Sequence, residues 1–133
     1  MDPRAYKDLL VKSGHVYRTF LSPATDKALP TILFIHGFPS TAYDWRHQVS
    51  FFTKAGYGVI APDLLGHGGS SKPDQVAHYK PSKIAADLLD VVEQCNASKV
   101  VAVGHDWYAT SSCICCCTLD TDGCVLTTWW SIV

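Results

Sequence analysis

Apolar residues in the first hundred positions form short runs separated by polar turns. Residues 32–35 are four consecutive apolar side chains behind a proline, which indicates a strand buried on both faces of a sheet. Residues 57–61 and 99–103 have the same character and predict two further strands. Residues 15–21 alternate their side chains and predict an earlier strand before a Ser-Pro turn.

Helical periodicity separates these strands. Within residues 42–55, Trp45, Val49 and Phe52 stand at positions i, i+4 and i+7 and share one face, and Gly56 is a typical helix end. A second helix is predicted to begin at Pro81 and to end near Asn96. Its apolar face consists of Ile84, Leu88, Val91 and Cys95.

The predicted order is therefore strand, helix, strand, helix, strand. Such an order favours right-handed crossovers and a parallel sheet with helices on both faces, which is the α/β class. Ligands bind beyond the carboxyl ends of the strands in such sheets. Three loops leave those ends, at residues 36–39, 63–71 and 104–107, and we expect them to meet at one rim.

The charge pattern limits the partners. The chain of 133 residues has 11 basic and 12 acidic side chains, and no basic cluster marks a surface for nucleic acid or an anionic membrane. The charged beginning and the lack of a long apolar run favour neither a secretory signal nor a membrane span. We therefore expect a soluble, cytoplasmic protein that acts on a neutral or weakly polar small molecule.

Four motifs carry a family resemblance. His-Gly-Phe-Pro at 36–39, Tyr-Asp-Trp-Arg-His-Gln at 43–48, Asp-Leu-Leu-Gly-His-Gly-Gly-Ser at 63–70 and Gly-His-Asp-Trp at 104–107 stand in one order. Together they resemble epoxide hydrolases of the α/β-hydrolase fold over about four-fifths of the chain. The resemblance implies that residues 1–108 are the front part of such a domain, a mainly parallel sheet with flanking helices. We expect the cap domain and the C-terminal half to be absent.

The resemblance makes Asp106 the catalytic nucleophile. The motif Gly-x-nucleophile-x-Gly forms a sharp strand-to-helix turn, and the chain matches it from Gly104 until Tyr108 replaces the last glycine. A carboxyl group with an ordinary pKa of about 3.9 is ionised at neutral pH and needs no base to attack. It suits displacement at an alkyl carbon, which opens an epoxide or expels a halide and leaves an ester. The alternative is that Asp106 only caps the following helix.

The resemblance also places the oxyanion site at the backbone N–H groups of Phe38 and Trp107. Pro39 can hold a cis peptide bond, although an ordinary turn proline is the alternative; Trp107 is alternatively a core residue. We give His36 and His105 no catalytic role, because in the family the first belongs to the oxyanion loop and the second points away. The supporting motif residues are His36, Gly37, Pro39 and Gly104.

The glycine-rich loop 66–69 invites a phosphate-binding hypothesis. However, Ser71 replaces the third glycine of the dinucleotide fingerprint, and no Gly-Lys-Ser/Thr sequence follows. In the family that the chain resembles, this loop is structural.

Other members of the family place an acid and then a histidine after the nucleophile. No histidine follows Asp106 here, and Asp120 and Asp122 come too early in the chain to be that acid. The two cap tyrosines that protonate the opening epoxide are also missing. We therefore expect at most one alkylation of Asp106 and no turnover, with an epoxide and water as the implied reactants and no cofactor.

Residues 109–133 show neither helical nor strand periodicity and hold five of the six cysteines, Cys113, Cys115, Cys116, Cys117 and Cys124. One interpretation is a thiolate metal site built on the C-x-x-C spacing. The other is a segment not selected to pack, in a non-catalytic fragment. The enzymatic alternative is a dehalogenase, which uses the same Asp and Trp, but Phe38 favours epoxides.

Overall fold

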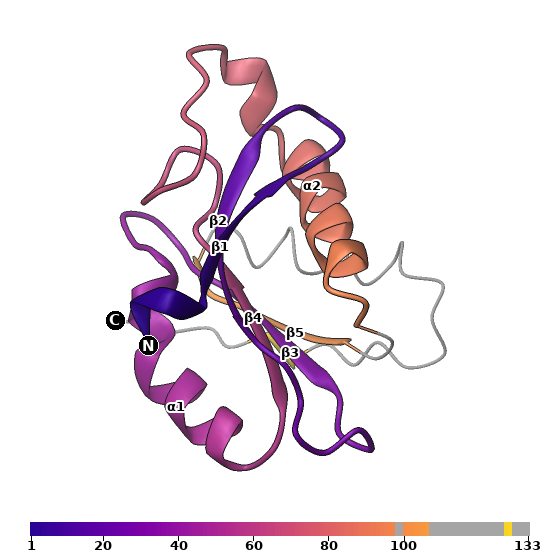
Figure 1. The fold of residues 1–133 in the computed structure, drawn as a ribbon. Helices are drawn as coiled ribbons and strands as arrows, with labels where there is room; N and C mark the ends of the chain where they lie inside the picture. The colour runs from indigo at the N-terminus through magenta and orange to yellow at the C-terminus, as the bar shows by residue number, and fades with distance from the viewer. Residues whose placement is uncertain (98–99, 107–126, 129–133) are drawn as a thin grey trace.

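The computed structural model describes residues 1–97, 100–106 and 127–128. In this part of the chain the strands form one six-stranded sheet in the order β1-β2-β4-β3-β5-β6, with helices packed against it (Figure 1). The strands are β1 (Tyr6–Leu10), β2 (Val16–Ser22), β3 (Thr31–Ile35), β4 (Gly58–Pro62), β5 (Val100–Gly104) and β6 (Thr127–Thr128). The helices are α1 (Arg46–Lys54) and α2 (Pro81–Gln94), with short 3-10 turns η1 (Pro3–Ala5), η2 (Ala42–Trp45) and η3 (Val76–Tyr79).

The centre of the sheet is parallel, as predicted. Strand β3 pairs in parallel with β4 on one side and β5 on the other, whereas β2 is antiparallel to both β1 and β4. The two edge strands, β1 and β6, were not predicted. Strand β6 has only two residues, which is too short to show a period. The α/β class with a mainly parallel sheet is thus confirmed, with an antiparallel edge added by the first hairpin.

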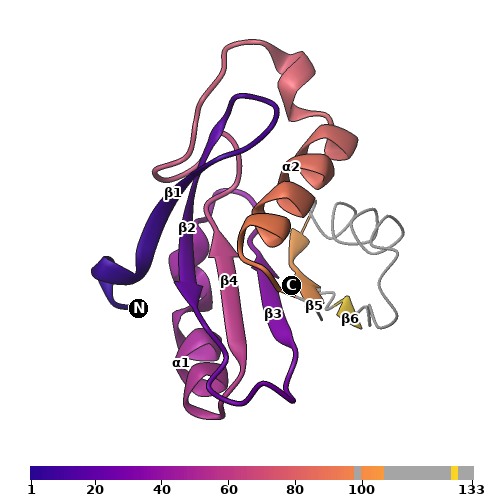
Figure 2. The same cartoon turned by 45° about the vertical axis from the view of Figure 1, so that its right-hand side comes forward.

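Strand β3 explains why the sheet needs a helix on each face. Ile32 and Phe34 pack in one apolar cluster with Val49 of α1, whereas Leu33 and Ile35 pack in a second cluster with Leu88 of α2. Successive side chains of a strand point to opposite faces, so the continuous apolar run requires cover on both sides. Figure 2 shows α1 and α2 on opposite sides of the strands.

The first predicted helix is divided in the structure. Residues 42–45 form the 3-10 turn η2, and α1 begins only at Arg46. The division falls at Trp45, whose backbone (φ −82°, ψ 6°) leaves the α-helical region. Its ring stacks on Phe34 with 4.9 Å between centroids, so a tertiary contact accompanies the break. The predicted end is correct, because Gly56 has φ +95°.

The second helix agrees more closely with its prediction. Proline opens α2 in its first turn, and the chain leaves the helix through Asn96 at φ +53°. Ile84, Leu88 and Val91 are fully buried, as their shared face predicts. No helix of the described residues is long and apolar enough to cross a membrane.

Candidate active site

The chain turns sharply after β5. The His105 N–H donates to the Ile35 carbonyl oxygen at 3.0 Å and extends the pairing with β3, and the next residue, Asp106, has φ +64°. A residue other than glycine seldom adopts this left-handed conformation, and such residues cluster at active sites. The strand therefore ends in a tight bend that carries the exposed side chain of Asp106.

The loop after β3 meets this bend. The Phe38 backbone N–H donates to Asp106 Oδ2 at 3.1 Å, although the two residues stand 68 positions apart. The contact follows from topology, because Ile35 and Gly104 are paired at the ends of adjacent parallel strands. The Phe38–Pro39 peptide bond is cis, the state that Pro39 was expected to allow. Trp107, the other predicted oxyanion donor, lies outside the described residues.

Gly37 provides the space for this contact. A Cβ atom on Gly37 would lie 2.4 Å from Asp106 Cβ and 3.0 Å from Asp106 Oδ2. Real Cβ atoms do not approach other carbons so closely, so a larger residue would displace the carboxylate. The glycine of the His-Gly-Phe-Pro motif thus has a steric role at the site.

The buried side chain of His36 holds the loop after β3 in place. Its ring is 1% exposed; Nδ1 donates to the Gly37 carbonyl oxygen at 2.8 Å, and Nε2 accepts from the Leu64 N–H at 2.8 Å. These partners define the neutral tautomer with its proton on Nδ1. Burial lowers the pKa of His36, although the hydrogen bond to Gly37 opposes this shift. The imidazole therefore joins the loops after β3 and β4, with both nitrogens occupied by backbone groups.

The lowered pKa of His36 predicts a loss of stability in acid. The unfolded chain binds a proton at a histidine pKa of about 6.5, whereas the folded chain resists it, so the free energy of unfolding should fall as pH drops below that value. His36→Gln removes this titration while its side-chain oxygen can still accept from Leu64. Urea unfolding from pH 7.5 to 5 should show a shallower acid-side decline in His36→Gln than in the parent chain. Equal slopes would contradict this assignment.

Asp63 organises the loop after β4. Oδ1 accepts from the Ala42 N–H at 2.9 Å and Oδ2 accepts from the Gly69 N–H at 3.0 Å, while the carbonyl oxygen accepts from Ser70 Oγ at 2.6 Å. A Cβ on Gly68 would lie 2.0 Å from Asp63 Oδ2. The glycine-rich loop is therefore wrapped around a buried carboxylate, as expected of a structural loop. The role of Asp63 at the centre of this loop was not predicted from the sequence.

A hollow of about 190 Å³ opens beside the bend. The neighbouring Phe38 is 72% exposed. Among the described residues, the buried Trp45 Nε1 has no hydrogen-bond partner. The lining residues are His36, Gly37, Ser40, Asp44, Trp45, Gln48 and His105.

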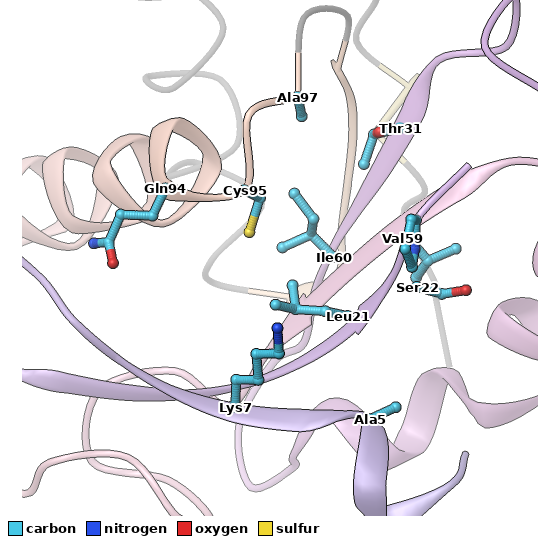
Figure 3. Close-up of a pocket in the computed structure, with 11 residues that line it drawn as sticks. Ala5, Lys7, Leu21, Ser22, Thr31, Val59, Ile60, Gln94, Cys95 and Ala97 are labelled. Carbon is cyan, nitrogen blue, oxygen red and sulfur yellow. The ribbon is translucent and has the colours of Figure 1, made fainter. Parts of the chain in front are cut away.

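Figure 3 shows the residues around a larger hollow of about 350 Å³. It includes Thr31 and Val59, which stand at the starts of β3 and β4, whereas the bend follows the other ends of the parallel strands. Burial raises the pKa of the Cys95 thiol in its wall, although the charge of Lys7 opposes the shift. The reactive thiolate form is thereby disfavoured, so this hollow offers no comparable nucleophile.

The metal hypothesis for the tail concerns cysteines that lie outside the described residues. Within the described ranges, no group of three or more His, Cys, Asp and Glu side chains could hold an ion. The cysteines on which the hypothesis rests, Cys113, Cys116, Cys117 and Cys124, lie outside those ranges.

Comparisons with known proteins agree with the α/β fold described above. A family model described as alpha/beta hydrolase fold matches residues 30–114. Epoxide hydrolase A of Mycobacterium tuberculosis (strain ATCC 25618 / H37Rv) is 43% identical over 86 residues, which are 65% of this chain and 27% of that protein. An epoxide hydrolase of Caballeronia sordidicola is 46% identical over 81 residues, 61% of this chain and 25% of that protein. The chain thus spans about a quarter of the length of these relatives.

Solved structures show the same partial correspondence. Epoxide Hydrolase A from Mycobacterium thermoresistibile aligns with a TM-score of 0.80 at 31% identity, covering 92% of this chain and 38% of that one. An epoxide hydrolase from Vigna radiata aligns with a TM-score of 0.82 at 26% identity, covering 92% and 38%. The described fold is therefore similar to one part of a larger hydrolase.

Proposed function

We propose that this chain, which belongs to the α/β-hydrolase fold family, carries the nucleophile of an epoxide-hydrolase-type site at Asp106 and forms a covalent ester with an epoxide. One observation carries the proposal: Asp106 stands in a left-handed bend with Oδ2 accepting from the Phe38 N–H at 3.1 Å. The similarity to epoxide hydrolases selects the substrate class. We assign residues 1–108 to this partial domain.

The proposed step uses the two carboxylate oxygens differently. Oδ1 attacks a ring carbon of the epoxide and forms a C–O bond, while the bond from that carbon to the ring oxygen breaks. The released alkoxide takes a proton from water. Oδ2 becomes the carbonyl oxygen of the ester and keeps the Phe38 hydrogen bond, which places an oxyanion donor where charge would develop during ester hydrolysis. Such a donor typically contributes about 3 to 4 kcal/mol to that step.

Release of the product needs a base that activates water. No histidine follows Asp106 in these 133 residues, and both ring nitrogens of His36 are engaged with backbone groups. We therefore propose that a protein of this sequence stops at the ester. The reaction would be stoichiometric and not catalytic.

The test combines intact-mass spectrometry with product analysis. Thiols are first blocked with iodoacetamide, because six cysteines would compete for an epoxide. Excess styrene oxide should then add one adduct per folded chain, and the diol should stay below one equivalent. Sustained diol formation would disprove the stoichiometric mechanism, and a folded chain without any adduct would disprove the nucleophile. Benzyl chloride in a parallel arm tests the dehalogenase alternative, which predicts faster labelling by the halide.

Substitution of Gly37 tests the geometry of the site. Gly37→Ala should slow adduct formation by about 100-fold, because displacement of a reacting group by about 1 Å can cost that much. The rate is measured by quenched intact-mass spectrometry. Asp74→Ala is the control, since Asp74 is exposed in a loop away from the bend. Equal labelling rates in the two variants would refute the steric role of Gly37.

A further inference from the structure

Two histidines outside the proposed site face each other. His15 Nε2 and His78 Nδ1 lie 3.0 Å apart, and the rings meet edge to face with 4.8 Å between centroids. The residues are 63 positions apart in the chain. His15 belongs to the turn between β1 and β2, whereas His78 belongs to η3. The fold thus brings together two imidazoles from separate surface segments.

The backbone at His15 is held in place. Its carbonyl oxygen accepts from the Val11 N–H at 2.9 Å, and the hairpin turns through Gly14 at φ +85°. The following residue, Val16, exchanges hydrogen bonds with Ser71: its N–H donates to Ser71 Oγ at 2.9 Å, and its carbonyl accepts from the Ser71 N–H at 2.9 Å. His15 therefore has little backbone freedom.

The backbone at His78 is held in a similar way. Its N–H donates to the Gln75 carbonyl at 3.1 Å within η3. The next residue, Tyr79, donates its hydroxyl to the Pro73 carbonyl at 2.8 Å, and its ring packs against Gly66. Both imidazoles are thus presented by anchored segments, and both residues are half-buried.

A second histidine pair in the chain provides a contrast. His36 and His67 also meet edge to face, with 5.1 Å between ring centroids. However, the two nitrogens of His36 are taken by Gly37 and Leu64 in the buried interior. In the His15–His78 pair, by contrast, a nitrogen of one ring faces a nitrogen of the other.

We propose that His15 and His78 form a two-histidine binding site for a divalent transition-metal ion such as Ni²⁺ or Cu²⁺, with water as the remaining ligands. Imidazole–metal bonds are about 2.0 to 2.1 Å long, so two nitrogens bound at a right angle lie about 2.9 Å apart. The observed separation of 3.0 Å fits this arrangement, which is typical of tetragonal Cu²⁺ and Ni²⁺. In the free chain one ring donates its only N–H across this gap to the other. When the metal binds, that proton moves to the far nitrogen of the same ring by exchange with water, so both facing nitrogens can bind the ion and each neutral ring keeps one proton, on Nδ1 of His15 and on Nε2 of His78.

A metal ion bound to both histidines would link the β1–β2 hairpin to η3, the turn that precedes α2. The ion binds the folded chain, where the two nitrogens are adjacent, more tightly than the unfolded chain. Metal binding should therefore stabilise the fold by linkage. This effect is independent of Asp106, so the proposal can fail while the proposed function stands.

The test is calorimetric titration of the untagged full chain with NiCl₂. Thiols are blocked with iodoacetamide beforehand, because the cysteines of residues 113–124 could also bind the metal. We expect one Ni²⁺ per chain, a higher midpoint of thermal unfolding with Ni²⁺, and at least a tenfold loss of affinity in both His15→Ala and His78→Ala. His47→Ala is the matched control, since His47 is exposed on α1, and it should bind like the parent chain.

No binding by the parent chain, or unchanged affinity in His15→Ala or His78→Ala, would overturn the proposal. Circular dichroism confirms that each variant is folded. If an alanine variant unfolds, His15→Gln and His78→Gln repeat the comparison with a polar side chain of similar reach.

Discussion

Replacement of Asp106 by Asn is expected to abolish the styrene oxide adduct on the thiol-blocked chain. The amide keeps the size of the carboxylate, and its oxygen can still accept from the Phe38 N–H that now bonds Oδ2. Asn also tolerates the left-handed backbone at φ +64°. The substitution therefore removes the anionic nucleophile with little change of shape. Intact-mass spectrometry should show the parent chain with one adduct and the variant with none.

Asp74→Asn is the matched control for this experiment, because Asp74 is exposed in a loop of the same domain. It should be labelled like the parent chain. Persistent labelling of Asp106→Asn at the parent rate would mean that another group reacts with the epoxide.

Asp63→Ala is expected to lower the free energy of unfolding by about 2 to 6 kcal/mol. The substitution leaves the Ala42 and Gly69 N–H groups without the carboxylate acceptor that they now have. Each buried donor left unsatisfied costs about 1 to 3 kcal/mol. Domains of this size are stable by only about 5 to 15 kcal/mol. The variant should therefore be close to unfolding at room temperature, as urea denaturation followed by circular dichroism would show.

Asp63→Asn provides the graded comparison, since the amide keeps one acceptor and should destabilise less than alanine. Asp74→Ala, at an exposed position, should change the free energy by at most about 0.5 kcal/mol. A similar small effect for Asp63→Ala would show that the glycine-rich loop does not depend on its central carboxylate.

Apolar periodicity predicted the buried part of the fold because burial there leaves a direct trace in the sequence. The run at residues 32–35 is covered on both faces, by α1 and by α2. The face of Ile84, Leu88 and Val91 likewise packs into one core cluster. These elements are specified by their own side chains.

Strand β1 leaves no such trace. Lys7 and Asp8 in its middle are exposed, and the strand is held by its register with β2. An edge strand of this kind depends on its partner more than on its own alternation. The division of residues 42–55 at Trp45 similarly coincides with a stacking contact to Phe34 that lies across the fold.

The proposed site was predictable only in part. The strand order predicted that the loops after β3 and β5 meet at one rim, whereas the choice of Phe38 as a partner of Asp106 came from the family resemblance. The role of Asp63 could not be predicted, because its N–H partners are Ala42 at the start of the 3-10 turn η2 and Gly69 in a loop, and the pattern defines neither conformation. The Asp-x-x-Gly-x-Gly-Gly-Ser sequence directly after a buried strand was the available signal.

The nucleophile assignment is tested most directly by locating the bond that the epoxide forms. After thiol blocking and reaction with styrene oxide, tandem mass spectrometry of proteolytic peptides should find the added mass on Asp106, and hydroxylamine should remove it, as expected of an ester. An adduct found on a histidine or lysine, or one that resists hydroxylamine, would contradict the account.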